Sequence, residues 1–313
     1  MEPRVVTVTD PDQWRRALDG ARAGGARVGL VPTMGALHAG HLSLVRRAAA
    51  TDDVVAITGY VNPLQFSPTE DLATYPRDPE RDAALAAGAG ARLVFAPTTD
   101  QLWPTPPATA VSLPALAGHL EGTSRPGHLD GVALVVAKLL CLSGPCTAYF
   151  GEKDWQQLVM VRRLVADLSL PVVVVAGPTV RDPDGLAVSS RNAYLTPAER
   201  AAAPTLYYAL LAGRAAVEEG EQRPEALRAA MAAVLARQPR LCAEYLEVAD
   251  PADLTSPEQV RGEVRLIGAA RLGRARLVDN ISAAPPPSAA PPPSAAPPPS
   301  AGPPPSTRDP GGD

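Results

Sequence analysis

Short apolar runs that alternate with helical patterns constrain the fold of this chain more than any other feature. Buried strands are predicted at residues 27–31, 54–61, 92–95, 148–150 and 172–175, and helices at 40–50, 79–87, 131–142 and about 155–168. A first helix is predicted near Asp10, because an N-cap residue there precedes Pro11. Continuous apolar strands that alternate with helices form a parallel sheet covered on both faces. Ligands of such sheets bind at the carboxyl ends of the strands.

The pattern changes after about residue 179. Ala-rich helical stretches follow at 197–219 and 224–238, and strand patterns at 245–248, 264–270 and 276–278. The predicted fold is therefore α/β, with a doubly wound, Rossmann-like sheet domain at 1–179 and a smaller α+β domain at 180–281 that closes over the site. Residues 282–313 cycle through Ser-Ala-Ala-Pro-Pro-Pro and are predicted to be a disordered, Pro/Ala/Ser-rich tail. A solvated extension is favoured there over a ligand for SH3-like or WW-like partners.

Charge and cysteine content narrow the class of protein. The net charge of −4 gives no general attraction to nucleic acid or to an anionic membrane, so small molecules are the expected partners. No apolar stretch has the length of a signal peptide or of a membrane span, which predicts a cytoplasmic protein. The three cysteines, Cys141, Cys146 and Cys242, contain no C-x-x-C pair and are predicted to be reduced thiols in the core.

The segment from Pro32 to His41 follows the first buried strand and opens the next helix. His38 and His41 are three residues apart at this helix start, and Gly35 and Gly40 allow the backbone to approach phosphate oxygens at the positive end of the helix. The segment is interpreted as a phosphate site. The simpler alternative is that one histidine caps the helix while the other is exposed.

Two later segments carry cations that suit a triphosphate. Lys153 follows the strand at 148–150, at the edge of the sheet where ligands bind. Asp154 beside it either caps the next helix or contacts an ATP ribose or a magnesium ion. Ser189, Ser190 and Arg191 form a small-residue loop that can fold over phosphates and exclude water, the alternative being an ordinary linker.

Five blocks together resemble the pantothenate synthetase family of the H-x-G-H nucleotidyltransferase superfamily, in the order typical of that family. They are Val31-Pro-Thr-Met-Gly-Ala-Leu-His-Ala-Gly-His41, Val61-Asn-Pro-Leu-Gln-Phe66, Tyr75-Pro-Arg77, Gly151-Glu-Lys-Asp-Trp-Gln-Gln-Leu158, and Val180-Arg-Asp182 with Val188-Ser-Ser-Arg-Asn192. The resemblance covers roughly residues 1–281. It implies an enzyme that uses ATP to activate pantoate as an acyl-adenylate and then couples it to β-alanine, giving pantothenate, AMP and pyrophosphate.

The resemblance also implies the residues of the site. Catalytic roles fall to His38, His41, Lys153 and Arg191, with a protonated His41 as general acid for pyrophosphate departure. The ATP-binding residues would be Met34, Gly35, Ala36, Leu37, His38, Ala39, Gly40, His41, Gly151, Glu152, Lys153, Asp154, Val180, Val188, Ser189, Ser190 and Arg191. Pantoate and β-alanine would contact Gln65, Gln157 and Tyr75, although Tyr75 has packing as an even alternative. Arg125 and His128 are expected either near this pocket or on a dimer surface. Mg²⁺ and a homodimer are expected from the resemblance, and the metal ligands are left open.

Three positions depart from the family pattern, namely Ala39, Gly59 and Leu64. Gly59 is unusual inside a predicted strand, because glycine weakens a strand interior. Two alternative functions would make different demands on the sequence. A nucleotidyltransferase for a phosphorylated acceptor would need several cations where this sequence offers Gln65 and Gln157. A regulatory module without catalysis would be expected to lack His41, Lys153 or Arg191.

Overall fold

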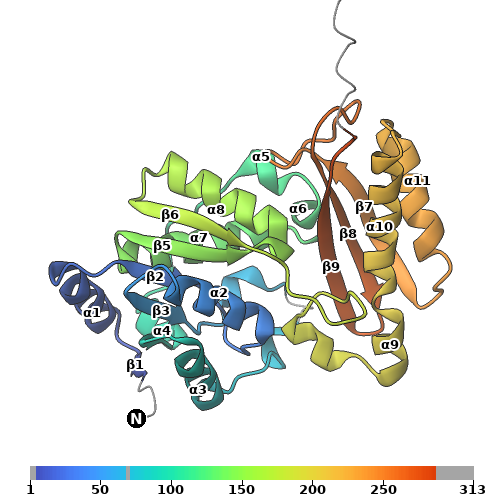
Figure 1. Cartoon of the computed structure of the whole chain (residues 1–313). Coiled ribbons are helices and arrows are strands. Elements are labelled where there is room, and N and C mark those ends of the chain that lie inside the picture. The colour runs from blue at the N-terminus through green and yellow to red at the C-terminus, as the bar shows by residue number, and fades with distance from the viewer. Residues whose placement is uncertain (1–4, 68–70, 287–313) are drawn as a thin grey trace, which may run out of the picture.

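The computed structural model describes residues 5–67 and 71–286, which form two β-sheets side by side (Figure 1). The strands are β1 (Val6–Val8), β2 (Val28–Val31), β3 (Val54–Thr58), β4 (Leu93–Phe95), β5 (Cys146–Gly151), β6 (Val172–Gly177), β7 (Leu241–Ala249), β8 (Val264–Leu272) and β9 (Ala275–Ala283). The longer helices are α1 (Pro11–Ala23), α2 (Ala39–Ala49), α3 (Pro79–Ala89), α7 (His128–Ser143), α8 (Trp155–Asp167), α10 (Thr205–Glu218) and α11 (Pro224–Leu235). Short α-helical turns are α4 (Thr99–Leu102), α5 (Pro114–Ala117), α6 (Glu121–Ser124) and α9 (Pro197–Ala202), and the 3₁₀ turns are η1 (Pro63–Gln65), η2 (Asp71–Ala73), η3 (Glu152–Asp154) and η4 (Ser190–Tyr194).

The first sheet is parallel in all its pairings and has the order β1-β4-β3-β2-β5-β6. Chain order reverses at β2, which pairs with β3 on one side and with β5 on the other. The carboxyl ends of β2 and β5 therefore lie next to each other. In open α/β sheets the ligand crevice forms at this switch point.

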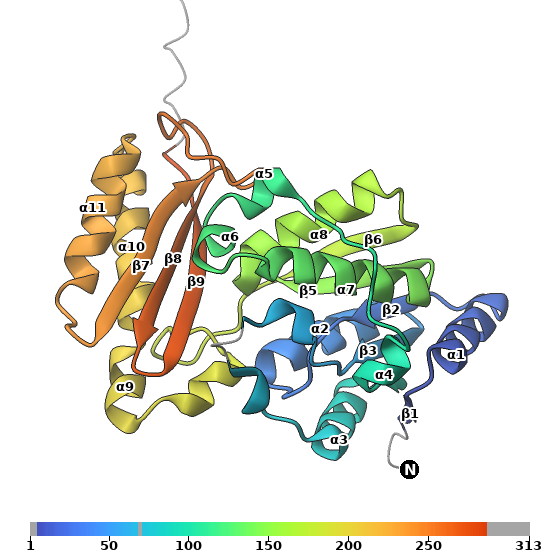
Figure 2. The same ribbon diagram turned by 180° about the vertical axis from the view of Figure 1, so that it is seen from behind.

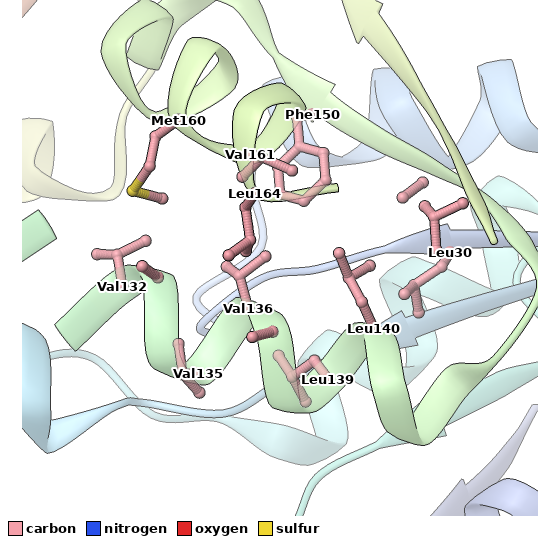
Figure 3. Close-up of a cluster of buried hydrophobic side chains, with 14 of the residues drawn as sticks. Leu30, Val132, Val135, Val136, Leu139, Leu140, Phe150, Met160, Val161 and Leu164 are labelled. Atoms are coloured by element: carbon pink, nitrogen blue, oxygen red, sulfur yellow. The ribbon is translucent and has the colours of Figure 1, made fainter. Parts of the chain in front are cut away.

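Helices cover both faces of this sheet, as the alternation of strands and helices predicted. α1, α7 and α8 pack on one face, and α2 and α3 pack on the other. Figure 3 shows the first of these layers, where Val132 and Val136 of α7 lie on the side that faces Met160 and Leu164 of α8. Burial of these side chains fixes the carboxyl ends of the strands on a rigid base.

The second sheet is antiparallel, with the order β7-β8-β9. α10 and α11 cover its outer face, away from the first sheet (Figures 1 and 2). Leu206 and Leu210 of α10, Leu227 and Met231 of α11 and Leu266 of β8 are fully or almost fully buried in this second core. This α+β part thus has a core of its own.

Several boundaries differ from the predictions. β3 ends at Thr58, so Gly59 lies beyond the strand, where it forms an isolated bridge with Met34. The predicted helix at 197–219 is two helices, because Pro204 lacks an N–H and its ring disfavours a continuous helix. β1 was not predicted, since it is a three-residue edge strand in which only Val8 is buried.

The predicted tail begins too early. Ser282 and Ala283 belong to β9, where they pair with Arg265 and Val264 of β8. Residues 287–313 of the tail lie outside the described residues. The prediction of core cysteines was also wrong, because Cys141 and Cys242 are exposed and Cys146 is half-buried.

Candidate active site

A buried carboxylate shapes the loop between β2 and α2. Asp82 of α3 accepts hydrogen bonds from the backbone N–H groups of Ala36 at 2.7 Å and Leu37 at 2.8 Å. Gly35 has a φ of +83°, and a Cβ atom there would lie 3.0 Å from the same carboxylate. The loop is therefore held in one conformation, which presents the start of α2 at the carboxyl end of β2.

His38 and His41 come together at this helix start. Their rings stack with centroids 4.0 Å apart and planes 23° apart. His38 is the N-cap of α2, and its Nδ1 accepts a hydrogen bond from the N–H of Gly40 at 3.2 Å. A ring nitrogen that accepts carries no proton, so the network assigns the proton of neutral His38 to Nε2. Capping, the simpler sequence alternative for one histidine, thus also leaves Nε2 as a donor.

Both histidines are neutral at physiological pH in this structure. Burial, with a smaller contribution from Lys153, lowers the pKa of His38 from 6.5 to about 4. Burial and the neighbouring His38 lower the pKa of His41 from 6.5 to about 3. The buried Nδ1 of His41 has no hydrogen-bond partner within the described part of the chain. A protonated His41, as predicted for a general acid, is therefore not the resting form of this site.

Lys153 and Asp154 lie in η3, directly after β5. The ammonium of Lys153 lies 3.3 Å from Asp154 Oδ1. The charges of Lys153 and Arg191 lower the pKa of Asp154, so the carboxylate is ionised at neutral pH. Asp154 precedes α8 without donating or accepting a side-chain cap hydrogen bond. Of the predicted alternatives for Asp154, helix capping is thus not what the structure shows.

The loop with Ser189, Ser190 and Arg191 approaches from the second sheet's side. A short hairpin leads into it, in which the N–H of Val188 donates to Val180 O at 2.9 Å. Ser189 Oγ accepts from the N–H of Arg191 at 3.3 Å. Tyr75 is 4% exposed and its Oη lies 3.3 Å from Ser190 Oγ. The structure therefore places Tyr75 beneath this loop as a packed side chain.

Gln65 is held by contacts that the sequence did not reveal. Asn62 is 1% exposed, and its amide donates to Gln65 Oε1 at 3.1 Å and to Gly131 O at 3.0 Å. His128 Nδ1 lies 2.8 Å from Gln65 O, and Arg125 donates to His128 Nε2 at 2.8 Å. Arg125 and His128 thus lie at the pocket, one of their two predicted locations.

A cavity of about 820 Å³ lies between the two sheets. Besides Arg125 and His128, seven predicted residues line it: Met34, Gln65, Lys153, Asp154, Gln157, Ser189 and Arg191. The other predicted residues lie outside its lining: Gly35, Ala36, Leu37, His38, Ala39, Gly40, His41, Tyr75, Gly151, Glu152, Val180, Val188 and Ser190. The charges of Lys153 and Asp154 nevertheless act on both imidazoles. The cavity therefore brings the predicted cations and both glutamines together.

The sequence did not reveal five buried polar residues that support the site. Two of them are Asn62 and Asp82. The other three, Arg265, Asp279 and Asn280 of the second sheet, are 5%, 4% and 3% exposed. A buried charged or amide side chain requires a partner, but its partner is far away in sequence. The one local signal is a polar residue at a position that the apolar pattern assigns to the core.

A magnesium ion would have little protein coordination here. Over residues 5–67 and 71–286, no three His, Cys, Asp or Glu side chains gather into a metal-binding group. Mg²⁺ that accompanies triphosphates needs only one or two carboxylates, with phosphate and water completing the shell. Asp154 is a carboxylate of the cavity lining, 3.3 Å from the Lys153 ammonium, so the residues present fit a phosphate-bound ion and not a protein-only cage.

Comparisons with known proteins agree with this geometry. The family model described as Pantoate-beta-alanine ligase matches residues 6–282. The pantothenate synthetase of Acidiphilium cryptum is 51% identical over 282 residues, which cover 89% of this chain and 99% of that protein. The protein of the same name from Chloroflexus aggregans is 51% identical over 261 residues, covering 83% and 94%. In the described residues no helix is both long and apolar enough to cross a membrane.

Solved structures give the same result. Pantothenate synthetase from Thermus thermophilus superposes with a TM-score of 0.83 at 47% identity, covering 88% of this chain and 98% of that one. Pantoate-beta-alanine ligase from Francisella tularensis, complexed with beta-gamma ATP and beta-alanine, has a TM-score of 0.74 at 30% identity, covering 89% and 97%. The chain therefore belongs to the pantoate-beta-alanine ligase family.

Proposed function

We propose that the protein condenses pantoate with β-alanine at the expense of ATP, through a pantoyl-adenylate. The proposal rests on one observation. Lys153 and Arg191 line the same cavity as Gln65 and Gln157. Two cations suit the phosphates of ATP, and two neutral amides suit a small hydroxy acid. Family membership supports the same reaction.

In the first half-reaction, a carboxylate oxygen of pantoate attacks the α-phosphorus of ATP. A bond forms between that oxygen and phosphorus, and the bond to the β-phosphate bridging oxygen breaks as pyrophosphate leaves. Negative charge grows on pyrophosphate, where fixed donors are most effective. Lys153 and Arg191 supply positive charge, and His38 supplies its Nε2–H as a neutral donor. His41 acts as an acid only after the charge of bound ATP raises its pKa.

In the second half-reaction, the unprotonated amine of β-alanine attacks the carbonyl carbon of the adenylate. The carbon–nitrogen bond forms, the bond from carbon to the phosphate oxygen breaks, and AMP leaves. Gln65 is suited to both steps, because Asn62 occupies its Oε1 and leaves the Nε2 donor beside Met34 Sδ at the cavity wall. An amide holds the carboxylate without the tight pairing that would weaken its nucleophilicity.

Mg²⁺, homodimer formation and a cytoplasmic location are further parts of the proposal. The ion would neutralise the phosphates, with Asp154 as its nearest protein group. Free thiols at all three cysteines fit a reducing compartment. Light scattering of the purified protein tests the dimer: a mass near 65 kDa, twice the chain mass of 32.5 kDa, is expected, and the monomer mass would reject it.

Isotope exchange between ATP and pyrophosphate tests the reaction directly. We expect exchange that depends on pantoate and Mg²⁺, and formation of AMP and pantothenate when β-alanine is added. His41→Ala should abolish the exchange. Folded protein that shows no pantoate-dependent exchange would overturn the proposal and direct attention to phosphorylated acceptors.

A further inference from the structure

Two consecutive residues of β9 contact the two cationic segments of the cleft. β9 packs against both η3, which contains Lys153, and η4, which contains Arg191. Asp279 and Asn280 are almost fully buried at this point of the strand. Successive side chains of a strand point to opposite faces. Asn280 therefore contacts η3, and Asp279 contacts the hairpin that leads to η4.

Asn280 holds the Lys153 turn through its backbone. Its Nδ2 donates to Glu152 O at 3.0 Å and to Lys153 O at 2.7 Å. Its Oδ1 accepts from Arg265 Nε at 2.8 Å, and Arg265 forms an ion pair of 3.1 Å with Glu152. Both amide protons and the amide oxygen of Asn280 are therefore used, so this side chain has one orientation.

Asp279 holds the hairpin that leads to Arg191. Its carboxylate accepts two hydrogen bonds from the guanidinium of Arg181, at 2.6 Å and 2.9 Å. Arg181 in turn donates to Gly185 O at 3.0 Å and lies over the ring of Tyr207, 4.0 Å from its centroid. A bidentate pair fixes direction as well as distance. The hairpin is thus anchored to the same point of β9 that anchors Lys153.

We propose that Asp279 and Asn280 are positioning residues that set the separation of Lys153 and Arg191. Both residues line the cavity, but their side-chain polar atoms are occupied by the segments that they hold. The inference rests on the proposed function, because it assigns both cations to one triphosphate. Two cations that stabilise one developing charge lose much of their effect when either is displaced by about 1 Å.

Near-isosteric variants test the proposal. Asn280→Asp replaces two donated hydrogen bonds by repulsion from two carbonyl oxygens, and Asp279→Asn weakens the bidentate pair with Arg181. In each variant the rate of pantoate-dependent exchange should fall by about 10- to 100-fold. The KM for pantoate should stay within about twofold, because Gln65 is untouched. Ser282→Ala, on the same strand but near Glu263 at the surface, is the matched control and should leave the rate unchanged.

A double-mutant cycle separates positioning from a general loss of structure. Binding of β,γ-methylene-ATP is measured by calorimetry for Asn280→Ala with and without Lys153→Ala. Asn280→Ala should weaken binding about tenfold alone, but less than about twofold when Lys153 is already absent, since coupled residues are not additive. Equal effects in both backgrounds would overturn the proposal, as would wild-type exchange rates in Asn280→Asp. An inactive wild-type protein would instead reject the proposed function, so the two failures are distinguishable.

Discussion

At the scale of single residues, the first histidine of the H-x-G-H segment has two roles that depend on each other. Its Nδ1 caps α2 by accepting from Gly40, and this leaves Nε2 as the donor. A Cβ atom on Gly40 would lie 3.0 Å from the His38 ring, so a larger residue at position 40 would disturb the cap. The small residue in the first turn of α2 is therefore needed for the tautomer as well as for phosphate approach.

The lowered histidine pKa values predict a dependence of stability on pH. A histidine whose pKa is lower in the folded state binds fewer protons there than in the unfolded chain, so stability is lost as pH falls through the unfolded value of 6.5. His41 should contribute a loss of about 1–2 kcal/mol in the free energy of unfolding between pH 7 and pH 5. Urea unfolding of wild type and His41→Gln at both pH values measures it. A variant with the same loss as wild type would contradict the prediction.

Asn62 is expected to matter for pantoate more than for ATP. Asn62→Ala frees the Gln65 amide to rotate and removes the side-chain donor to Gly131 O. We expect kcat/KM for pantoate to fall by about 10- to 100-fold. The free energy of unfolding should fall by about 0.5–1.5 kcal/mol, since a buried side-chain hydrogen bond to Gly131 O is lost. Steady-state kinetics with each substrate varied in turn checks this, and an equal fall for ATP would argue against a role through Gln65.

The sequence predicted the residues that act at the site better than the residues that hold them. His38, His41, Lys153 and Arg191 belong to local motifs, in which strand, loop and helix follow one another in the chain. Asn280 holds Lys153 from 127 positions away in sequence, and no local pattern specifies such a pair. Tyr75 lies in a motif too, but burial under Ser190 places it outside the cavity lining.

At the scale of elements, strands with a continuous apolar run were predictable, whereas strands without one were predicted in part or not at all. β2 is an uninterrupted buried run, so its sequence alone identifies it. β7 was predicted only from Tyr245, but it begins at Leu241. Of its first three residues only Leu241 is buried, and an irregularity in pairing between Ala243 and Tyr245 breaks the apolar pattern there. β1 owes its existence to pairing with β4 and not to its own pattern. Pairing partners decide the ends of such strands.

The packing of α7 against η1 gives a prediction with an internal control. A Cβ atom on Gly131 would lie 2.1 Å from Leu64 O, so Gly131→Ala must push η1 and Gln65 away from the helix. We expect a KM for pantoate raised by about tenfold or more, with ATP affinity nearly unchanged. Gly88→Ala in α3 meets nothing within 4 Å and should instead raise the free energy of unfolding by about 0.5–1 kcal/mol. A Gly131→Ala variant that behaves like Gly88→Ala would refute the close-packing argument.

At the scale of the whole molecule, the two sheets are joined beside the cavity by buried charges. Arg276 of β9 donates to both oxygens of Glu121 in α6, at 2.7 Å and 2.8 Å, and to Glu244 of β7 at 2.7 Å. Tyr245 donates to Glu121 at 2.6 Å. Burial alone would raise the pKa of Glu121, but Arg276 outweighs burial and lowers it. Glu121 is therefore ionised. Glu121 and Glu244 share the Arg276 guanidinium, and each has a second cation, Arg125 at 3.7 Å from Glu121 and Arg271 at 2.7 Å from Glu244.

Removal of that guanidinium should destabilise the chain in a way that depends on pH. Arg276→Ala leaves Glu121 and Glu244, with side chains 13% and 17% exposed, without their shared cation. We expect a loss of about 1–3 kcal/mol in the free energy of unfolding at pH 7, because Arg125 and Arg271 still compensate part of the charge of the two carboxylates. Because the carboxylates of the variant can be protonated, the difference from wild type should shrink as pH falls toward 4, in the range where a normal Glu titrates.

Urea unfolding from pH 7 to pH 4 measures both the size and the slope of this effect. Arg214→Ala is the matched control, since the Arg214 pair with Glu218 is 42% and 59% exposed and should contribute less than about 0.5 kcal/mol at any pH. A deficit for Arg276→Ala that stays constant with pH would mean that lost packing, and not unpaired carboxylates, causes it. A deficit as small as that of the control would mean that the charges at this interface are hydrated, and that apolar packing holds the two sheets together.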